Sequence, residues 1–371
     1  MVGIKQLQDE NLLAKSKQSK LPQFLEAGIK VPLYRFGNQS LIDHESFGEL
    51  SCISEDGDSI LDTLLLAQWE DRVMKGIFRY DVTASEIKAV EGRKKFLAQL
   101  NEGWNLGHFP KPGENQTIYQ EDVFPFNSVK QHDELLFCVA SSEQTKPVLI
   151  SSAVVPDNAF LIFINASPVE YGHVLLVPYL NNSFYQLLDV NILEMAVRVA
   201  VEINNCCFRL FYDFSPDASH LHFQACYFPN PLAVELMPVD TIFGDLQSWM
   251  HISVVTDYPI KTLLLESSHK FKIMMEVLVN ICSCLQDLSI SYSLLISDCG
   301  KKIFLFLQKS KDSSFLSAWE CGGYFLYKSR SEFGECTEKT MLKQLSSVSI
   351  DDDGFKAVKL LCCSIASKFG F

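Results

Sequence analysis

Two histidines and a glutamine recur at every second position in SHLHFQACYF, residues 219–228 of the chain. Most of the other residues in this stretch are apolar or aromatic, which is typical of a buried β-strand, where alternate side chains point to the same face. The stretch therefore predicts a polar face made of His220, His222 and Gln224, and an apolar face made of Leu221, Phe223 and Ala225. Burying three polar groups together costs free energy unless they bond to one another or to a ligand.

The polar face could support several chemistries. A metal site would need a third ligand at a recognisable spacing, and a serine or cysteine nucleophile would need an elbow such as Gly-x-Ser-x-Gly; the sequence offers neither. A neutral imidazole can itself attack phosphorus and form a phosphoramidate, which splits one transfer into two displacements. Gln224, a neutral amide donor, could then hydrogen-bond a phosphoryl oxygen on the same face. A pair of structural core histidines stays open as the alternative.

Composition limits the class of protein and of partner. The chain has 371 residues, of which 47% are hydrophobic and 21% charged, so it is long enough for two domains with a sizeable core. Its net charge of −13 argues against nucleic acid or an anionic membrane as the main partner, because both require a basic surface. The oligomeric state leaves no clear mark in the sequence, and a homo-oligomer stays open.

Cysteine spacing and the N-terminal residues bear on metal binding and location. The 12 cysteines include no Cys-x-x-Cys pair, so we expect reduced thiols and no zinc site. Residues 1–20 have no apolar core of signal-peptide length. We expect a cytoplasmic protein, with nuclear entry left open.

Changes in composition divide the chain into three parts. Residues 1–58 are expected to form a polar, weakly ordered arm, residues 59–235 an N-terminal half, and residues 236–371 a C-terminal half with a helical tail. Residues 183–205 have the clearest amphipathic helical pattern. The second half repeats a strand, a helix (270–288) and a hairpin, so antiparallel hairpins with segregated helices predict an α+β fold.

The strand with the two histidines resembles the His-x-His-x-Gln strand of the galactose-1-phosphate uridylyltransferase branch of the histidine triad superfamily. Other stretches, in the same order, resemble the plant GDP-L-galactose phosphorylase family: GIFRYDVTASEIKAV, FLAQLNEG, INASPVEYGHVLLVP and SYSLLISDCGKKIFLFLQ. The resemblance covers roughly residues 60–330. It implies two histidine-triad-like half domains, each an antiparallel sheet with packed helices.

The resemblance also implies a ping-pong reaction of the plant vitamin C pathway, with GDP-hexose and inorganic phosphate as substrates and no cofactor. GDP-L-galactose would give its GMP moiety to a histidine and release L-galactose 1-phosphate, and phosphate would then collect the GMP as GDP. His222 would be the nucleophile, His220 its neighbour in the phosphate site, and Gln224 the donor to a phosphate oxygen. The implied substrate-binding residues are Gln99, Asn101, Asp213, Ser219 and His173. For His173, a purely structural role stays open.

The segment before the motif departs from the family. FYDFSPDASH is about three residues shorter, and Asp213 stands where the family has an asparagine. A carboxylate about 4 Å from a phosphate oxygen costs on the order of 4 kcal/mol at an effective dielectric near 20, roughly a thousandfold in rate. Pro216 also has no N–H to offer a phosphate. If Asp213 faces the phosphates, we expect it to hinder the reaction.

Two further departures remove cations. Trp104 replaces an arginine of the family, and the following loop, residues 105–127, keeps Lys111 as its one cation. Each lost charge-assisted hydrogen bond to a phosphate is worth roughly 1.5–3 kcal/mol. The alternative to an active phosphorylase is therefore a catalytically weak or inactive paralogue that binds a nucleotide, or the active enzyme, as a regulator.

Overall fold

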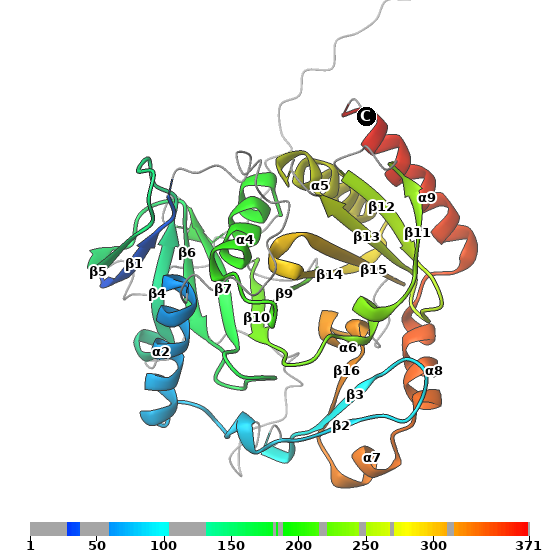
Figure 1. The fold of residues 1–371 in the computed structure, drawn as a ribbon, viewed down its shortest axis with the longest axis horizontal. Helices are drawn as coiled ribbons and strands as arrows, with labels where there is room; N and C mark the ends of the chain where they lie inside the picture. The colour runs from blue at the N-terminus through cyan, green and yellow to red at the C-terminus, as the bar shows by residue number, and fades with distance from the viewer. Residues whose placement is uncertain are drawn as a thin grey trace, which may run out of the picture.

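The strands of the protein form two sheets in a computed structural model (Figure 1). The structure describes residues 28–37, 59–103, 131–180, 183–184, 188–214, 221–244, 250–267, 271–309 and 315–369. The large sheet has 13 strands, in the order β11-β12-β13-β15-β14-β9-β10-β7-β6-β4-β1-β5, with β8 paired to β7. The small sheet has three strands in the order β16-β3-β2. Helices pack on these sheets, so the predicted α+β class is confirmed.

The elements have the following bounds. The large sheet contains β1 (Lys30–Arg35), β4 (Leu135–Ala140), β5 (Val148–Val154), β6 (Ala159–Ile164), β7 (Val174–Leu180), β8 (Ser183–Phe184), β9 (Phe208–Asp213), β10 (Phe223–Tyr227), β11 (Val239–Phe243), β12 (Met250–Val255), β13 (Thr262–Ser267), β14 (Ser291–Ser297) and β15 (Lys302–Gln308). The small sheet contains β2 (Glu86–Ala89), β3 (Leu97–Leu100) and β16 (Tyr324–Tyr327). The α-helices are α2 (Ile60–Met74), α3 (Gln131–Glu134), α4 (Val190–Ile203), α5 (Phe271–Asp287), α6 (Ala318–Gly322), α7 (Arg330–Glu335), α8 (Glu338–Val348) and α9 (Asp352–Ser367). Short 3₁₀ turns are η2 (Val82–Ala84), η4 (Ala233–Leu236) and η5 (Asp298–Gly300).

The two halves of the chain share both sheets. In the large sheet, β9 of the first half pairs antiparallel with β14 of the second, with Phe211 opposite Leu295. In the small sheet, β3 pairs parallel with β16, with Gln99 opposite Leu326. Among the described strands of the large sheet, neighbours are antiparallel except β1 and β4. The adjacent strands β9 and β10 therefore have a strand of the C-terminal half, β14, on one side and a strand of the N-terminal half, β7, on the other.

Helix α4 covers the sheet with its apolar face. Leu193, Ala196, Val197 and Ala200 are buried against the core, at the spacing of one helix face. The predicted helix over residues 183–205 is confirmed only from Val190, because the Asp189 side chain accepts a 2.8 Å hydrogen bond from the N–H of Ile192 and caps the helix there. Helices α4 and α5 lie in the same layer (Figure 1) and bury their residues in one cluster.

The expectation of a weakly ordered arm over residues 1–58 is wrong for Lys30–Arg35. These residues form β1, which lies between β4 and β5. Leu33 and Tyr34 are buried, and the Tyr34 hydroxyl donates to Glu202 at 3.0 Å. The polar composition around this short segment hides it, because its pairing partners come from residues more than 100 positions away.

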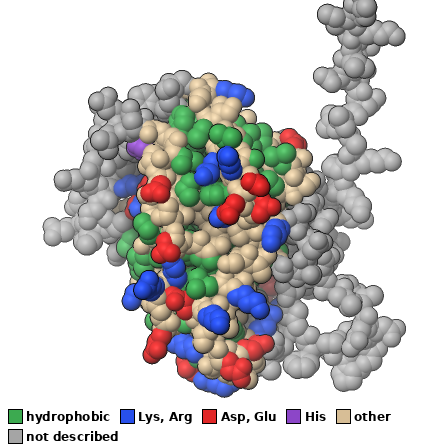
Figure 2. Space-filling view, turned by 90° about the vertical axis from the view of Figure 1, so that its right-hand side faces the viewer, with side chains coloured by type: hydrophobic (Ala, Val, Ile, Leu, Met, Phe, Trp, Pro, Cys, Tyr) green, Lys and Arg blue, Asp and Glu red, His purple; other side chains and the backbone are tan. Residues whose placement is uncertain are grey.

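The surface carries charges of both signs. On the face seen in Figure 2, Lys and Arg side chains are interspersed with Asp and Glu side chains over the described residues. Such a mixed surface does not offer the single-sign field that a nucleic-acid backbone attracts. Among the described helices, none has the length and apolar character needed to cross a membrane.

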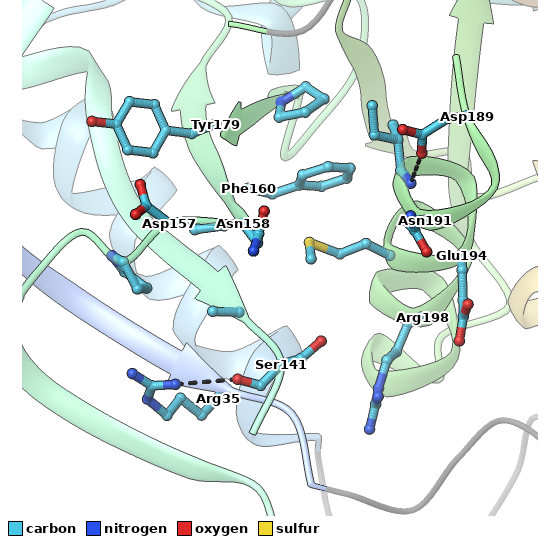
Figure 3. Close-up of a pocket in the computed structure, with 16 residues that line it drawn as sticks. Arg35, Ser141, Asp157, Asn158, Phe160, Tyr179, Asp189, Asn191, Glu194 and Arg198 are labelled. Carbon is cyan, nitrogen blue, oxygen red and sulfur yellow. Dashed lines mark hydrogen bonds between the residues drawn. The ribbon is translucent and has the colours of Figure 1, made fainter. Parts of the chain in front are cut away.

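A cavity of about 510 Å³ lies between α4 and the ends of β6 and β7 (Figure 3). Its apolar lining includes Phe160, Ile192 and Met195, which lie on the side of the sheet covered by α4. Charged groups of both signs, such as Arg35 and Asp157, stand around it. Because neither Gln224 nor His222 lines this cavity, it is separate from the polar face of β10.

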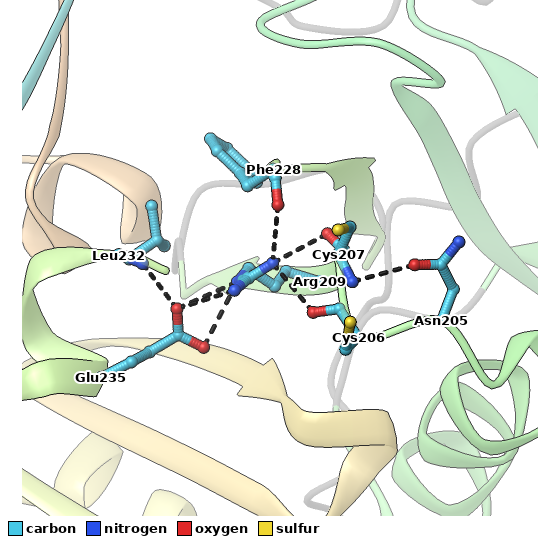
Figure 4. A network of polar contacts seen from close by, with 7 residues as sticks. All are labelled: Asn205, Cys206, Cys207, Arg209, Phe228, Leu232 and Glu235. Carbon is cyan, nitrogen blue, oxygen red and sulfur yellow. Dashed lines mark hydrogen bonds and ion pairs between the residues drawn. The ribbon is translucent and has the colours of Figure 1, made fainter. Parts of the chain in front are cut away.

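A buried ion pair fixes the connection between the halves (Figure 4). The guanidinium of Arg209, on β9, lies 3.0 Å from the Glu235 carboxylate on η4. Its Nη1 also donates to the backbone oxygens of Cys206, Cys207 and Phe228, at 2.8–3.2 Å. Arg209 is 4% exposed, so these contacts replace its water shell.

Replacing Arg209 by alanine is expected to lower the free energy of unfolding by about 3–5 kcal/mol, because Glu235 would remain buried without its partner. The measurement is urea unfolding of the variant against the wild type. The exposed pair of Arg330 and Glu86 supplies the control, and Arg330→Ala should cost less than about 1 kcal/mol. Equal losses in the two variants would contradict a structural role for the buried pair.

Candidate active site

The strand β10, which contains Gln224 and directly follows His222, lies inside the large sheet between β9 and β7. Leu221, Phe223 and Ala225 are buried in the core under α4, as the alternation predicts. Gln224 pairs with Leu175 of β7, which belongs to a separate apolar cluster on the other face of the sheet. His222 and Gln224 are both partly exposed on that face. The other two predicted residues of this stretch, His220 and Ser219, lie outside the described residues.

His173 lies directly behind Gln224. Its Nδ1 accepts a 2.9 Å hydrogen bond from the N–H of Val169, so the ring proton is on Nε2. Nε2 lies 3.1 Å from Oε1 of Gln224 and donates to it. This bond engages the amide oxygen and turns the Nε2 donors of Gln224 the other way, as a phosphate-oxygen donor requires.

Burial keeps His173 neutral. The residue is fully buried, and desolvation lowers its pKa to about 4. The hydrogen bond to Gln224 raises the pKa but offsets only part of this effect. A neutral ring keeps one tautomer across the physiological range, which holds Gln224 in one orientation. With no exposed surface and both nitrogens engaged, His173 reaches a substrate only through Gln224, and we interpret it as a positioning residue.

This burial makes stability depend on pH. Because the pKa of His173 is about 4 in the folded state and 6.5 ordinarily, the unfolded state takes up a proton first as the pH falls. The contribution of His173 to the free energy of unfolding, about 3 kcal/mol, is complete above about pH 6.5 and is lost as the pH falls towards 4. Urea unfolding at pH 7 and 4.5 should show a smaller loss for His173→Gln than for the wild type. His251→Gln, on β12, is the control and should lose as much as the wild type; an equal loss in His173→Gln would contradict the argument.

Gln99 and Asn101 hold the turn that precedes His173, residues 165–173. The Gln99 side chain is buried on β3 and donates from Nε2 to the Val169 oxygen at 2.8 Å. Asn101 contacts the hydroxyl of Tyr80, which donates to the Pro168 oxygen at 2.7 Å. The Oε1 atom of Gln99 has no hydrogen-bond partner among the described residues. Such a buried acceptor is satisfied by a ligand or an ordered water.

Asp213 lies on the same face of the sheet as His222. It ends β9, where the register sets Phe211 opposite Gln224; continuing two residues along both strands sets Asp213 opposite His222. Paired residues of antiparallel strands point to the same face. The carboxylate that the sequence identified as a departure from the family therefore stands on the candidate catalytic face.

Side chains from the C-terminal half complete the surroundings of His173. The ring of Trp319, on α6, meets the His173 ring edge-on with centroids 6.2 Å apart. The hydroxyl of Tyr324, on β16, donates to Oε1 of Glu170 at 2.5 Å. Sequence reasoning missed these three residues. Glu170 did leave a signal, as a lone acid in an apolar run beside His173, whereas nothing in the sequence places Trp319 or Tyr324 there.

Among the described residues, no group of three or more His, Cys, Asp or Glu side chains lies close enough together to hold a metal ion. The described face offers an imidazole and an amide, with the carboxylate of Asp213 on the same face. His222 can act as a nucleophile and Gln224 as a donor to an oxyanion.

Comparison with known proteins identifies the family. The N-terminal domain model of the GDPGP1-like family matches residues 60–226, and its C-terminal domain model matches residues 233–369. The chain belongs to the GDPGP1-like family. The chain is 33% identical to GDP-L-galactose phosphorylase 1 of Arabidopsis thaliana, over 90% of this chain and 80% of that protein. It is 23% identical to GDP-D-glucose phosphorylase 1 of Danio rerio, over 81% of this chain and 90% of that protein.

A solved structure shares the GDPGP1-like fold. Yeast Ap4A phosphorylase Apa2, solved in complex with AMP, superposes with a TM-score of 0.54 and 16% sequence identity, over 79% of this chain and 97% of that chain. At this identity the likeness concerns the fold. The predicted family is therefore confirmed, with the addition that strands of its N-terminal and C-terminal domains join in one sheet; the histidine-triad-like character of the two halves stays a prediction.

Proposed function

We propose that this chain is a GDP-hexose phosphorylase, a nucleotidyltransferase that converts GDP-L-galactose and phosphate to L-galactose 1-phosphate and GDP, as in ascorbate biosynthesis. The observation that carries the proposal is the amide of Gln224, oriented by a neutral His173 beside His222 on the open face of β10. Relatives named as GDP-L-galactose and GDP-D-glucose phosphorylases support the substrate class.

The reaction divides into two displacements at one phosphorus atom. A ring nitrogen of His222 attacks the α-phosphorus of the GDP-hexose, the bond from that phosphorus to the bridging oxygen breaks, and hexose 1-phosphate leaves. An oxygen of inorganic phosphate then attacks the same phosphorus, the P–N bond breaks, and GDP leaves. In both steps Gln224 donates to a non-bridging oxygen, where negative charge must be stabilised. Following the sequence, we place His220 and Ser219 in the phosphate site.

The first test is to trap the covalent intermediate. The protein is incubated with GDP-L-galactose or GDP-D-glucose without phosphate and weighed intact by mass spectrometry. A GMP-sized adduct that inorganic phosphate discharges supports the phosphorylase. A folded protein that still binds GDP but forms no adduct with either sugar nucleotide would favour the inactive regulatory paralogue.

We propose L-galactose as the preferred sugar, because identity to the plant relatives named for it is 33%, against 23% for the zebrafish relative named for D-glucose. The ratio of kcat/KM for the two sugar nucleotides measures this preference. We further propose that the protein acts in the cytoplasm without nucleic-acid or membrane partners, in keeping with its net charge of −13 and the mixed charges of its surface.

A further inference from the structure

The turn of residues 165–173 has a single tightly defined shape. The side chain of Asn165 accepts from the N–H of Ser167 at 2.9 Å, and the Tyr171 oxygen accepts from the N–H of Tyr227 at 3.0 Å. Gly172 has a φ of +68°, and a Cβ there would lie 2.5 Å from the Tyr227 ring. Because Val169 of this turn holds the Nδ1 atom of His173, the turn decides where that ring lies.

A buried acid ties this turn to the C-terminal half. Glu170 is 7% exposed and Tyr324 is 1% exposed. Besides the 2.5 Å bond from Tyr324, the Glu170 carboxylate accepts at 3.3 Å from the N–H of Tyr171. Cys226 lies nearby, two residues along β10 from Gln224, and its thiol pKa is raised by burial and by the charge of Glu170. The Glu170 carboxylate thus links the turn to β16 of the C-terminal half.

Retaining this acid costs folding free energy. Burial raises the pKa of Glu170, in opposition to the Tyr324 and Tyr171 hydrogen bonds, so ionisation of this group is unfavourable where it stands. An apolar or amide side chain would avoid that cost. Groups kept at a cost in stability are often retained for activity.

We propose that Glu170 is a positioning residue, through which Tyr324 of the C-terminal half fixes the turn that orients His173 and thereby the Gln224 amide. The inference rests on the proposed phosphorylase function and deepens it. The contacts are continuous: the Tyr324 hydroxyl bonds to Glu170, the backbone of the turn joins Glu170 to Val169, and Val169 contacts His173, which bonds to Gln224. The C-terminal half thereby takes part in setting the geometry of a site whose nucleophile lies in the N-terminal half.

The kinetic test uses Tyr324→Phe, which removes one hydroxyl. We expect kcat to fall roughly tenfold with KM for both substrates within about twofold, because misplacement of a transition-state donor affects the chemical step. Glu170→Gln keeps one oxygen acceptor but replaces the other carboxylate oxygen with an amide donor, so either the Tyr324 hydroxyl or the Tyr171 N–H loses its acceptor and kcat should fall, by up to about the same tenfold. Tyr258→Phe is the matched control. The Tyr258 hydroxyl donates to the backbone oxygen of Cys321 at 2.8 Å and makes this bond outside the turn. An unchanged kcat in Tyr324→Phe, or an equal loss in Tyr258→Phe, would overturn the proposal.

A double-mutant cycle shows whether the effect passes through His173. In the His173→Gln background, Tyr324→Phe should cause no further loss of kcat, because the ring that it acts through is absent. Independent, multiplying losses in the double variant would overturn the proposal. Long-range ¹H–¹⁵N spectra give a readout independent of turnover, with the His173 signal among the 8 histidines assigned by its loss in His173→Gln. The wild type should show the single Nε2–H tautomer and Tyr324→Phe a mixture; one unchanged tautomer would overturn the proposal.

These readouts separate the two hypotheses. If the wild type forms no GMP adduct with either sugar nucleotide, the proposed function fails, while the His173 spectra still decide whether Tyr324 and Glu170 set the ring. If the adduct forms and the spectra and kinetics of Tyr324→Phe match the wild type, the positioning proposal fails and the phosphorylase stands.

Discussion

His222→Asn is expected to abolish GMP transfer, with loss of both the covalent adduct and turnover by at least about 10⁴-fold, the scale on which removing a nucleophile acts. Asparagine keeps a polar side chain just before β10 but has no nitrogen lone pair that can attack phosphorus. His222 is partly exposed and stands immediately before the strand, so the substitution leaves the buried apolar face of β10 untouched. The measurements are intact-protein mass after incubation without phosphate, and steady-state release of GDP with phosphate.

His251→Asn is the matched control for this experiment. His251 lies on β12, two strands beyond the hairpin of β14 and β15, and is also partly exposed. Its variant should form the adduct as the wild type does. Turnover by His222→Asn within tenfold of the wild type would remove His222 from the nucleophile role.

Asp213→Asn is expected to raise the rate of GMP transfer by at least about tenfold. The register of β9 and β10 sets Phe211 opposite Gln224; continued by two residues, it sets Asp213 opposite His222, on the face that we propose receives the phosphates. A full negative charge about 4 Å from a phosphate oxygen costs on the order of 4 kcal/mol at an effective dielectric near 20. Asp213 as a whole is partly exposed although its Oδ1 atom is buried, so solvent screens part of the charge and the gain should be less than the thousandfold that this energy implies. The measurement is kcat/KM for GDP-L-galactose at low ionic strength.

Asp240→Asn controls for the change in net charge, because Asp240 is exposed on β11 at the edge of the sheet. It should leave kcat/KM within about twofold of the wild type. The gain in Asp213→Asn should shrink as salt is added, since screening weakens the repulsion that the substitution removes. An unchanged rate in Asp213→Asn would show that the carboxylate does not face the phosphates, and a lower rate would show that it supports a histidine instead of opposing the substrate.

The sequence by itself determined the local features of the site. Alternation in residues 219–228 predicts which side of β10 is polar, and the buried Phe223 and Ala225 confirm it, because a strand has a period of two wherever it lies. The helical period likewise does not depend on where a helix lies, so the spacing of apolar residues predicts α4 and α5. The start of α4 is decided by the Asp189 cap. The family motifs and their order along the chain are read directly from the sequence, and they predict nucleotidyl transfer through a histidine.

Tertiary structure decided how these parts act together. His173 and Gln224 are 51 residues apart, Gln99 and Val169 are 70 apart, and Glu170 and Tyr324 are 154 apart. No periodicity links such positions, because strand register and the pairing of the two halves bring them into contact. For the same reason β1 escaped prediction, as a six-residue strand identified by its partners β4 and β5 and not by its own composition. Hydrogen bonds and burial depend on these distant neighbours, so the roles that we propose for His173, Asp213 and Glu170 could be argued only from the fold.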